Sequence, residues 1–170
     1  MNIFVLDLDP VKAAKAMDCV RVPKMVTESA QMMASALRRH GATDEQMPLT
    51  KSGTPYKGGY HHHPCTVWAG DSMGNYQWLA DHAIALCIEY KLRFGKIHAC
   101  QAPIMKMDSM DVFIKPHHGR VTPFAQAMPD EYKDNDAVKA YRAYYMSKVN
   151  SPGGVHYRHT SPPDWWEVTA

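Results

Sequence analysis

The sequence lacks every segment that would place it in or across a membrane. No stretch approaches the roughly eighteen consecutive apolar residues that a membrane helix needs. The first ten residues have no basic region and contain Asp7 and Asp9, so they do not resemble a secretory signal. The sequence therefore predicts a cytoplasmic protein that has no membrane partner.

A strong excess of charge of one sign is also missing. The 19 Lys and Arg residues nearly balance the 17 Asp and Glu residues, which leaves a formal net charge of +2. This balance neither indicates nor excludes nucleic acid as a partner, so a binding surface must come from local clusters. The four cysteines form no CxxC pair, which indicates free thiols in a reducing compartment.

Repeats, low-complexity tracts and linkers are absent as well, and 170 residues suit one ordinary domain. Apolar residues make up 45% of the chain and charged residues 21%, which is typical of globular proteins. We therefore predict a single domain over residues 1–170, in which residues 150–170 form an irregular C-terminal tail.

Three segments show the three- and four-residue spacing of apolar side chains that is typical of amphipathic helices. They cover residues 24–40, about 75–94 and 137 to about 149. A shorter helix is expected from Pro10 to about Cys19, and Pro23 is expected to interrupt the helical pattern. The apolar run 3–8 before it fits either a buried strand or the entry to a helix.

Residues suited to helix ends flank these segments. Asp9, the pair Asp71-Ser72 and the pair Asn135-Asp136 stand where N-caps are expected, because their short polar side chains accept hydrogen bonds from free backbone N–H groups. Gly41 and Gly95 follow the last periodic residues, where glycine often ends a helix. Between the helices lie a long loop, 42–64, and a segment, 96–132, that four prolines break into short turns. The sequence thus predicts a mainly α, single-domain helical fold with long loops.

One acidic motif suggests phosphotransfer. The run Phe4-Val5-Leu6-Asp7-Leu8-Asp9 resembles the first motif of haloacid-dehalogenase-type phosphotransferases. The segment VWAGDS at residues 67–72, which contains Asp71, resembles their acidic metal motif. In that chemistry one Asp is a nucleophile, a second is an acid or base, and Mg²⁺ binds between them. Such folds need several buried parallel strands, of which this sequence offers one at most, so helix caps and turns are the competing interpretation.

The run His61-His62-His63-Pro64-Cys65 is the densest group of metal-ligand residue types. Adjacent histidines rarely all reach one ion, and no HExxH or CxxC spacing supports a zinc site, so we predict no metal and no cofactor. A metal-dependent hydrolase that uses this loop stays open as a third hypothesis. His63, beside a proline that fixes the backbone, is a candidate proton carrier.

Basic residues cluster on and beside the helix expected at 24–40. The members of this cluster are Arg21, Lys24, Arg38 and Arg39. Aromatic residues that could stack on bases lie in loops and in the tail, namely Tyr56, Tyr60, Trp68, Trp165 and Trp166. Together they have the composition of a phosphate-contacting surface with base-stacking tips, although solvated helix faces have the same composition.

Several longer runs are similar to those of a group of small phage-encoded proteins. These runs are MNIFVLDLDPVKAA, KMVTESAQ, HHPCTVWA, NYQWLADHAIALCIEY with RFGK, and PFAQAMPDEYK with DAVKAYRAYY. They are spread over nearly the whole chain.

The layout also resembles that of the phage pyrimidine-dimer DNA glycosylase family, the all-α endonuclease V. The shared features are a short N-terminal segment, a turn Val22-Pro23-Lys24 like that family's Leu-Pro-Arg, and a long helix that begins near Tyr76. A Pro-then-aromatic C-terminus, Pro162-Pro163-Asp164-Trp165-Trp166, completes the layout. The resemblance implies an all-α fold and DNA as the partner.

The resemblance also implies a mechanism. In that family the N-terminal α-amine attacks the sugar carbon, a nearby carboxylate assists through the Schiff-base and elimination steps, and a base is flipped out of kinked DNA. An α-amine suits this role because its reference pKa of about 8 leaves a neutral fraction at neutral pH.

Two positions depart from the family's pattern. Asn2 is bulky enough to block removal of the first residue, so the free amine belongs to Met1. Arg21 stands where the family has its carboxylate, just before the Leu-Pro-Arg turn, so the nearest acids are Asp18 and Glu28.

Our leading hypothesis is therefore a DNA-acting protein of the base-excision glycosylase or AP-lyase type. Its expected catalytic residues are Met1, Asp18, Glu28 and His63. Its expected DNA-binding residues are Arg21, Lys24, Arg38, Arg39, Trp68, Trp165 and Trp166. The alternative, which Arg21 in place of an acid favours, is a non-catalytic nucleic-acid-binding or host-interaction module on the same scaffold. The oligomeric state is not predicted.

Overall fold

The computed structural model describes residues 1–167, and its regular secondary structure in that range is helical. The helices are α1 (Pro10–Lys15), α2 (Arg21–Arg39), α3 (Pro64–Ala69), α4 (Met73–Phe94), α5 (Gln101–Asp108) and α6 (Ala137–Met146), with 3-10 turns η1 (Asp111–Phe113), η2 (Asp130–Tyr132) and η3 (Ser147–Asn150). The prediction of a mainly α fold is confirmed. The phosphotransferase interpretation is wrong, because residues 1–167 contain no strand and only one isolated β-bridge, so the parallel sheet it requires is missing.

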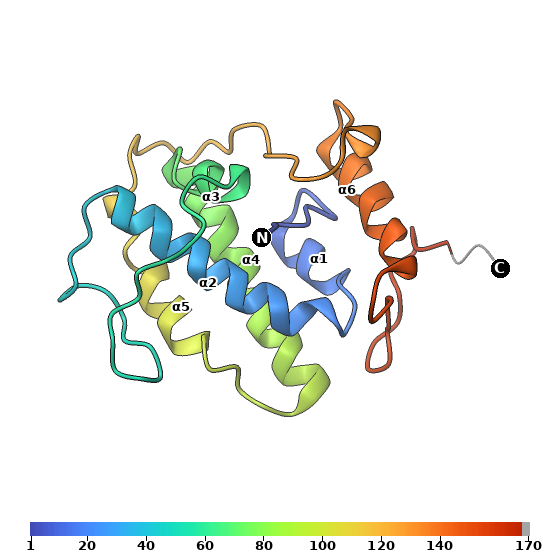
Figure 1. Cartoon of the computed structure of the whole chain (residues 1–170), viewed down its shortest axis with the longest axis horizontal. Coiled ribbons are helices and arrows are strands. Elements are labelled where there is room, and N and C mark those ends of the chain that lie inside the picture. The colour runs from blue at the N-terminus through green and yellow to red at the C-terminus, as the bar shows by residue number, and fades with distance from the viewer. Residues whose placement is uncertain (168–170) are drawn as a thin grey trace.

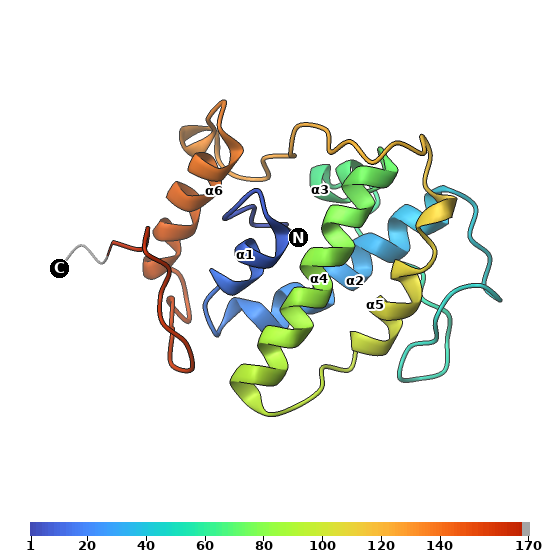
Figure 2. The ribbon, with the colours of Figure 1, turned by 180° about the vertical axis from the view of Figure 1, so that it is seen from behind.

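The two long helices, α2 and α4, cross at the centre of the molecule (Figure 1). α1 packs on α4, and α3 and α5 each contact both long helices. α6 lies at one end, and the N-terminal segment runs between α6 and the crossing pair, as the view from behind also shows (Figure 2). No helix among the described residues is long and apolar enough to cross a membrane.

The core between these helices is apolar and rich in methionine and alanine. Its largest fully buried side chains are Tyr76, Tyr141, Tyr145, Ile3, Leu6, Met17, Met25, Met32, Met33, Leu37, Met47 and Leu79. Apart from Met17, which follows α1, and Met47, in the loop after α2, these residues come from the N-terminal segment, α2, α4 and α6. Burial of apolar surface therefore fixes the N-terminus to the long helices.

Local capping chemistry formed as the sequence predicts. Asp9 and Asp136 each accept hydrogen bonds from two backbone N–H groups, at the starts of α1 and α6, and Ser72 accepts one from the N–H of Asn75 in α4. Gly95 ends α4 in the left-handed conformation, with φ of +67°, and Gly41 follows α2 with φ of +91°.

Three expectations about helix bounds were wrong. Residues 3–8 form neither a strand nor a helix but an irregular turn, in which residues 3–6 are buried, Leu8 is exposed and Phe4 has a φ of +37°. α1 ends at Lys15 rather than near Cys19. α2 begins at Arg21, ahead of Pro23, because a proline in the first helical turn gives up no intrahelical hydrogen bond.

The predicted loop 42–64 ends in a helix that the pattern does not indicate. α3 starts at Pro64, directly after the N-cap His63, and its six residues are too few to show a helical period. The broken segment 96–132 contains α5 and two 3-10 turns, in agreement with the prediction of short helical pieces.

The C-terminal tail docks on the body of the protein. The backbone N–H of Cys19 donates to the carbonyl of His156, and the N–H of His156 donates to the Asp18 carboxylate. Trp165 and Trp166 pack edge-on against Tyr145 of α6. These hydrogen bonds and aromatic contacts fix the tail to the surface of the helical domain, so it is not a frayed end.

Candidate active site

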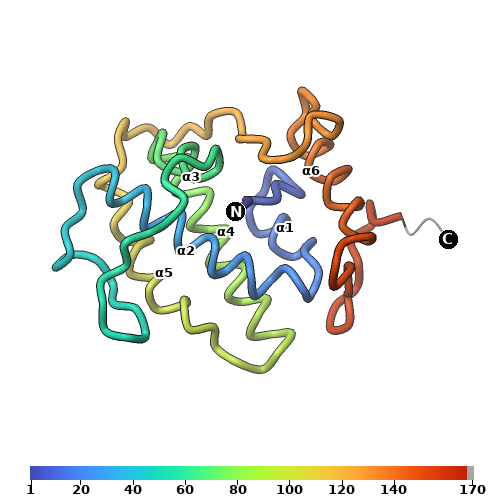
Figure 3. Tube along the Cα trace, in the orientation of Figure 1, coloured from blue at the N-terminus to red at the C-terminus, as the bar shows by residue number. Residues whose placement is uncertain are grey.

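A small cleft of about 260 Å³ lies beside the N-terminus and is called the N-terminal cleft below. Its walls come from the first residues, from α2, and from α6 with the start of the tail. The lining residues are Met1, Asn2, Phe4, Arg21, Lys24, Met25, Glu28, Tyr144, Lys148, Ser151 and Pro152. The Cα trace shows how the chain begins near the middle of the molecule rather than at its edge (Figure 3).

Met1 is anchored by its side chain, and its backbone faces the cleft. The side chain is 1% exposed, whereas the residue as a whole is partly exposed, so the accessible atoms belong to the main chain. The α-amine nitrogen lies 3.6 Å from Oε2 of Glu28. The structure thus brings an amine and a carboxylate together at the wall of a cleft.

Asn2 holds this end of the chain in place. Its backbone N–H donates to Oε2 of Glu28 at 2.9 Å. Its side-chain Oδ1 accepts from the N–H groups of Ile3 and Phe4, and its Nδ2 donates to the carbonyl of Ala127. Sequence reasoning gave Asn2 no structural role, because these partners depend on a turn that no periodic pattern predicts.

Glu28 and Lys24 form an i,i+4 pair on α2, with Nζ of Lys24 3.7 Å from Oε1 of Glu28. The Glu28 side chain is 13% exposed and that of Lys24 is 69% exposed. Because the Lys24 side chain is exposed, its pairing with Glu28 contributes little to stability, so Lys24 can leave Glu28 for another anion at small cost. Lys148 adds a further positive charge to the cleft and lies over the Tyr144 ring, with Nζ 3.8 Å from its centroid.

His63 is electrostatically coupled to the same pair. Its Nδ1 accepts the backbone N–H of Cys65 at 3.2 Å, which leaves the ring proton of the neutral form on Nε2. Burial lowers the pKa of His63, the N-terminal ammonium lowers it further, and Glu28 opposes the shift. His63 is therefore neutral at neutral pH and presents an N–H donor.

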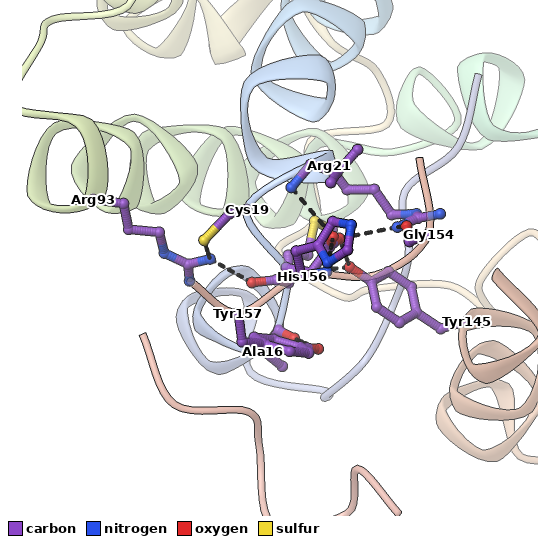
Figure 4. Close-up of polar contacts among 11 residues, drawn as sticks. Ala16, Cys19, Arg21, Arg93, Tyr145, Gly154, His156 and Tyr157 are labelled. Atoms are coloured by element: carbon purple, nitrogen blue, oxygen red, sulfur yellow. Dashed lines mark hydrogen bonds and ion pairs between the residues drawn. The ribbon is translucent and has the colours of Figure 1, made fainter. Parts of the chain in front are cut away.

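Asp18 and Arg21 have a different role. Asp18 is fully buried, and Oδ1 accepts from the Tyr145 hydroxyl at 2.6 Å and from Nη1 of Arg21 at 3.1 Å. Figure 4 shows Arg21, Tyr145 and the tail residues Gly154 and His156 gathered in this cluster. Arg21 also donates to the carbonyl of Gly154. No cleft-lining atom comes from Asp18, so the structure does not bring it together with the amine.

Arg38 and Arg39 lie at the far end of α2 from the cleft. Arg38 donates to the Tyr56 carbonyl and pairs with Asp44, while Arg39 pairs with Asp71 at 2.8 Å. Both partners of Arg38 lie in the loop that follows α2, so Arg38 holds that loop on the helix. This structural role accounts for Arg38 in the basic cluster without any DNA contact.

The tryptophans are not free stacking tips. Trp68 is 3% exposed and packs between Trp78 and Phe124 in the core. Trp165 and Trp166 are half-buried, and Arg142 lies over the Trp165 ring at 5.0 Å. Trp68 therefore cannot stack on a base in this conformation.

The histidine-rich loop shows no arrangement for a metal ion. Within residues 1–167, no three His, Cys, Asp or Glu side chains come close enough to hold one. His61 and His62 are exposed, whereas Cys65 is buried, and burial raises the pKa of its thiol to about 11. The thiol is thus neutral and unavailable as a thiolate ligand at neutral pH.

Comparison with known proteins gives one family. The model of a family described as pyrimidine dimer DNA glycosylase matches residues 1–101, which contain Met1, Lys24, Glu28 and His63. The search of curated proteins and the search of solved structures gave no match.

Proposed function

Because this chain belongs to the pyrimidine dimer DNA glycosylase family, we propose that it excises a damaged DNA base and cleaves the resulting abasic site through the amine of Met1. The observation that carries this proposal is the 3.6 Å separation between that amine and the Glu28 carboxylate at the wall of the N-terminal cleft. An amine with a carboxylate beside it is the pair that this chemistry requires.

The amine acts as the nucleophile. In its neutral form it attacks C1′ of the deoxyribose, the bond from C1′ to the base breaks, and the base leaves with the electron pair and gains a proton. The nitrogen then loses a proton to Glu28, whose Oε2 is the carboxylate oxygen next to it. The bond from C1′ to the ring oxygen breaks, the ring oxygen takes up a proton, and a Schiff base forms between nitrogen and C1′.

The same carboxylate serves the strand-cleaving step. Removal of a proton from C2′ of the Schiff base pushes out the oxygen at C3′, which breaks the strand with the phosphate as leaving group. Hydrolysis of the imine then returns the free amine of Met1. Glu28 is the only carboxylate among the residues that line the cleft, so we assign it both proton transfers.

His63 and the lysines complete the proposed site. His63 is not among the residues that line the cleft, and we propose that its neutral Nε2–H donates a hydrogen bond to the DNA beside it. Lys24 and Lys148 bind the phosphates on either side of the reacting nucleotide. The nucleotide turns out of the helix to bring its sugar to the amine.

Borohydride trapping tests this proposal. The protein is incubated with duplexes that contain an abasic site, a pyrimidine dimer or no damage, and the imine is reduced to a stable amine. We expect a covalent adduct with the abasic duplex and with the dimer duplex, and none with undamaged DNA.

A variant with one glycine added before Met1 is the matched control. It moves the amine by one residue, about 3.8 Å between Cα atoms, and leaves all side chains in place. Its trapping should fall strongly while its DNA affinity stays the same. Binding to DNA that weakens linearly with the logarithm of salt concentration, without any adduct, would instead support the non-catalytic binding module.

A further inference from the structure

Tyr60 is the one aromatic residue that is exposed among residues 1–167, with 67% of its surface accessible. Large aromatic side chains normally bury their rings, because each ring that leaves water contributes strongly to stability. The tryptophans that composition suggested for base stacking are buried or half-buried. Tyr60 therefore differs from every other aromatic residue that the structure describes.

The loop that carries Tyr60 is held firmly on α2. Oγ of Ser35 accepts the N–H of Gly59 at 2.8 Å and donates to its carbonyl at 2.9 Å. Arg38 donates twice to the carbonyl of Tyr56, at 3.0 and 2.8 Å. A Cβ on Gly58 would lie 2.6 Å from the backbone nitrogen of Ser35, so only glycine allows this close approach. Exposure of Tyr60 is thus a fixed feature and does not come from a loose loop.

The backbone at Tyr60 is strained. Its φ is +53°, in the left-handed region that bulky residues rarely adopt. The carbonyl of Tyr60 accepts the N–H of His63 at 2.9 Å, which closes a turn directly before α3. Strain of this kind persists where the surrounding contacts enforce it, and it concentrates at functional sites.

Tyr60 and the amine lie along the same face of α2. Glu28 and Ser35 are seven residues apart, which places them on one side of the helix with a separation of about 10 Å along its axis. Glu28 holds Met1, and Ser35 holds the loop of Tyr60. The chain between α2 and α3 first loops away from the end of α2 and then crosses back over α2 to reach α3 (Figure 1). His63, three residues after Tyr60, is electrostatically coupled to the amine and Glu28.

From this geometry we infer that Tyr60 stacks on a DNA base within about three steps of the reacting nucleotide, since steps along one strand are about 3.4 Å apart. The inference rests on the proposed function, because it takes DNA to lie along this face of α2. Every base has an aromatic face, so a rigid and exposed ring beside the site can stack on a neighbouring base without sequence preference.

A coupling experiment between protein and DNA tests the inference. Duplexes carry an uncleavable abasic analogue at the reacting position and, in turn, a second one at each of the three positions on either side. Affinity is measured for the wild type, Tyr60→Ala, Tyr60→Phe and Leu92→Ala. Leu92 is a matched control, because it is also exposed, at 74%, and lies near the end of α4.

We expect Tyr60→Ala to bind the singly modified duplex about tenfold more weakly than the wild type, with Tyr60→Phe and Leu92→Ala close to the wild type. Removal of one particular base should weaken the wild type by the same factor and leave Tyr60→Ala unaffected. An equal loss on every duplex, or no loss, would overturn the inference.

Borohydride trapping of the same proteins on a natural abasic site separates the two proposals. Trapping without a position-specific effect of Tyr60→Ala overturns the stacking role and leaves the catalytic proposal intact. A position-specific effect without trapping supports stacking and removes the catalytic proposal. Unchanged melting temperatures of the Tyr60 variants, expected because the ring is exposed, show that the loop still folds.

Discussion

Replacement of Glu28 by Gln separates chemistry from binding. In the wild type the backbone N–H of Asn2 donates to Oε2 of Glu28 at 2.9 Å. The amide of Gln keeps the size of the side chain and can still accept this hydrogen bond. It loses the negative charge that lies 3.6 Å from the amine nitrogen of Met1. The N-terminal segment should therefore stay in place, while the cleft loses its only carboxylate.

Two quantities bear on the size of the effect, the charge attraction that is lost and the usual contribution of a general base. Two unit charges 3.6 Å apart attract each other by about 4 to 5 kcal/mol at an effective dielectric constant of about 20, before desolvation is subtracted. Loss of a positioned general base slows a chemical step by about 10² to 10⁴-fold. We expect Glu28→Gln to reduce single-turnover trapping on abasic DNA within that range. DNA affinity should stay the same or rise, because one negative charge leaves a cleft that contains Lys24 and Lys148.

The assay compares trapping rate and DNA affinity for the wild type, Glu28→Gln and Glu131→Gln. Glu131 is exposed on η2, outside the N-terminal cleft, and controls for the change of net charge. Trapping by Glu28→Gln at the wild-type rate would refute the reasoning, since no other carboxylate lines the cleft.

Three further predictions concern stability. Asp18→Asn leaves Arg21 without its buried partner and should lower the free energy of unfolding in urea by about 3 kcal/mol; loss of trapping at unchanged stability would instead place Asp18 in the chemistry. Burial lowers the pKa of His82 from 6.5 to about 4, so the unfolded chain binds a proton first as pH falls. The free energy of unfolding should therefore decrease by up to about 3 kcal/mol as pH falls from 6.5 to 4. In His82→Gln this part of the pH dependence should be missing. The same pH dependence in the variant and the wild type would contradict the burial argument. Gly58→Ala and Gly53→Ala both place alanine at positive φ, but only the first meets other atoms, so its melting temperature should fall further, and equal shifts would contradict the close packing of that loop.

Local features of the fold were predictable from sequence. The caps Asp9, Ser72 and Asp136 formed because a cap depends on residues within the same turn. The amphipathic patterns likewise gave α2 and α4 to within about three residues. The irregular turn at residues 3–8 was not predictable, because an apolar run without a period fits several structures.

The site was only partly predictable, because it depends on contacts between distant residues. Sequence reasoning gave both Asp18 and Glu28 as candidate carboxylates, and only the fold directs Glu28 to Met1 and Asp18 into the core. Trp68 was expected in a loop, where it would be free to stack. It lies instead in α3, a helix too short to leave a periodic signal, and packs into the core.

The most direct test of this account is the identity of the nitrogen that borohydride fixes to DNA. The trapped adduct is digested with protease and nuclease, and the modified peptide is mapped by mass spectrometry. We predict that the sugar remnant is carried by the α-amine of Met1. A remnant on the side chain of Lys24, which also lines the cleft, or on any other lysine would contradict the central claim that the chain's first nitrogen is the nucleophile.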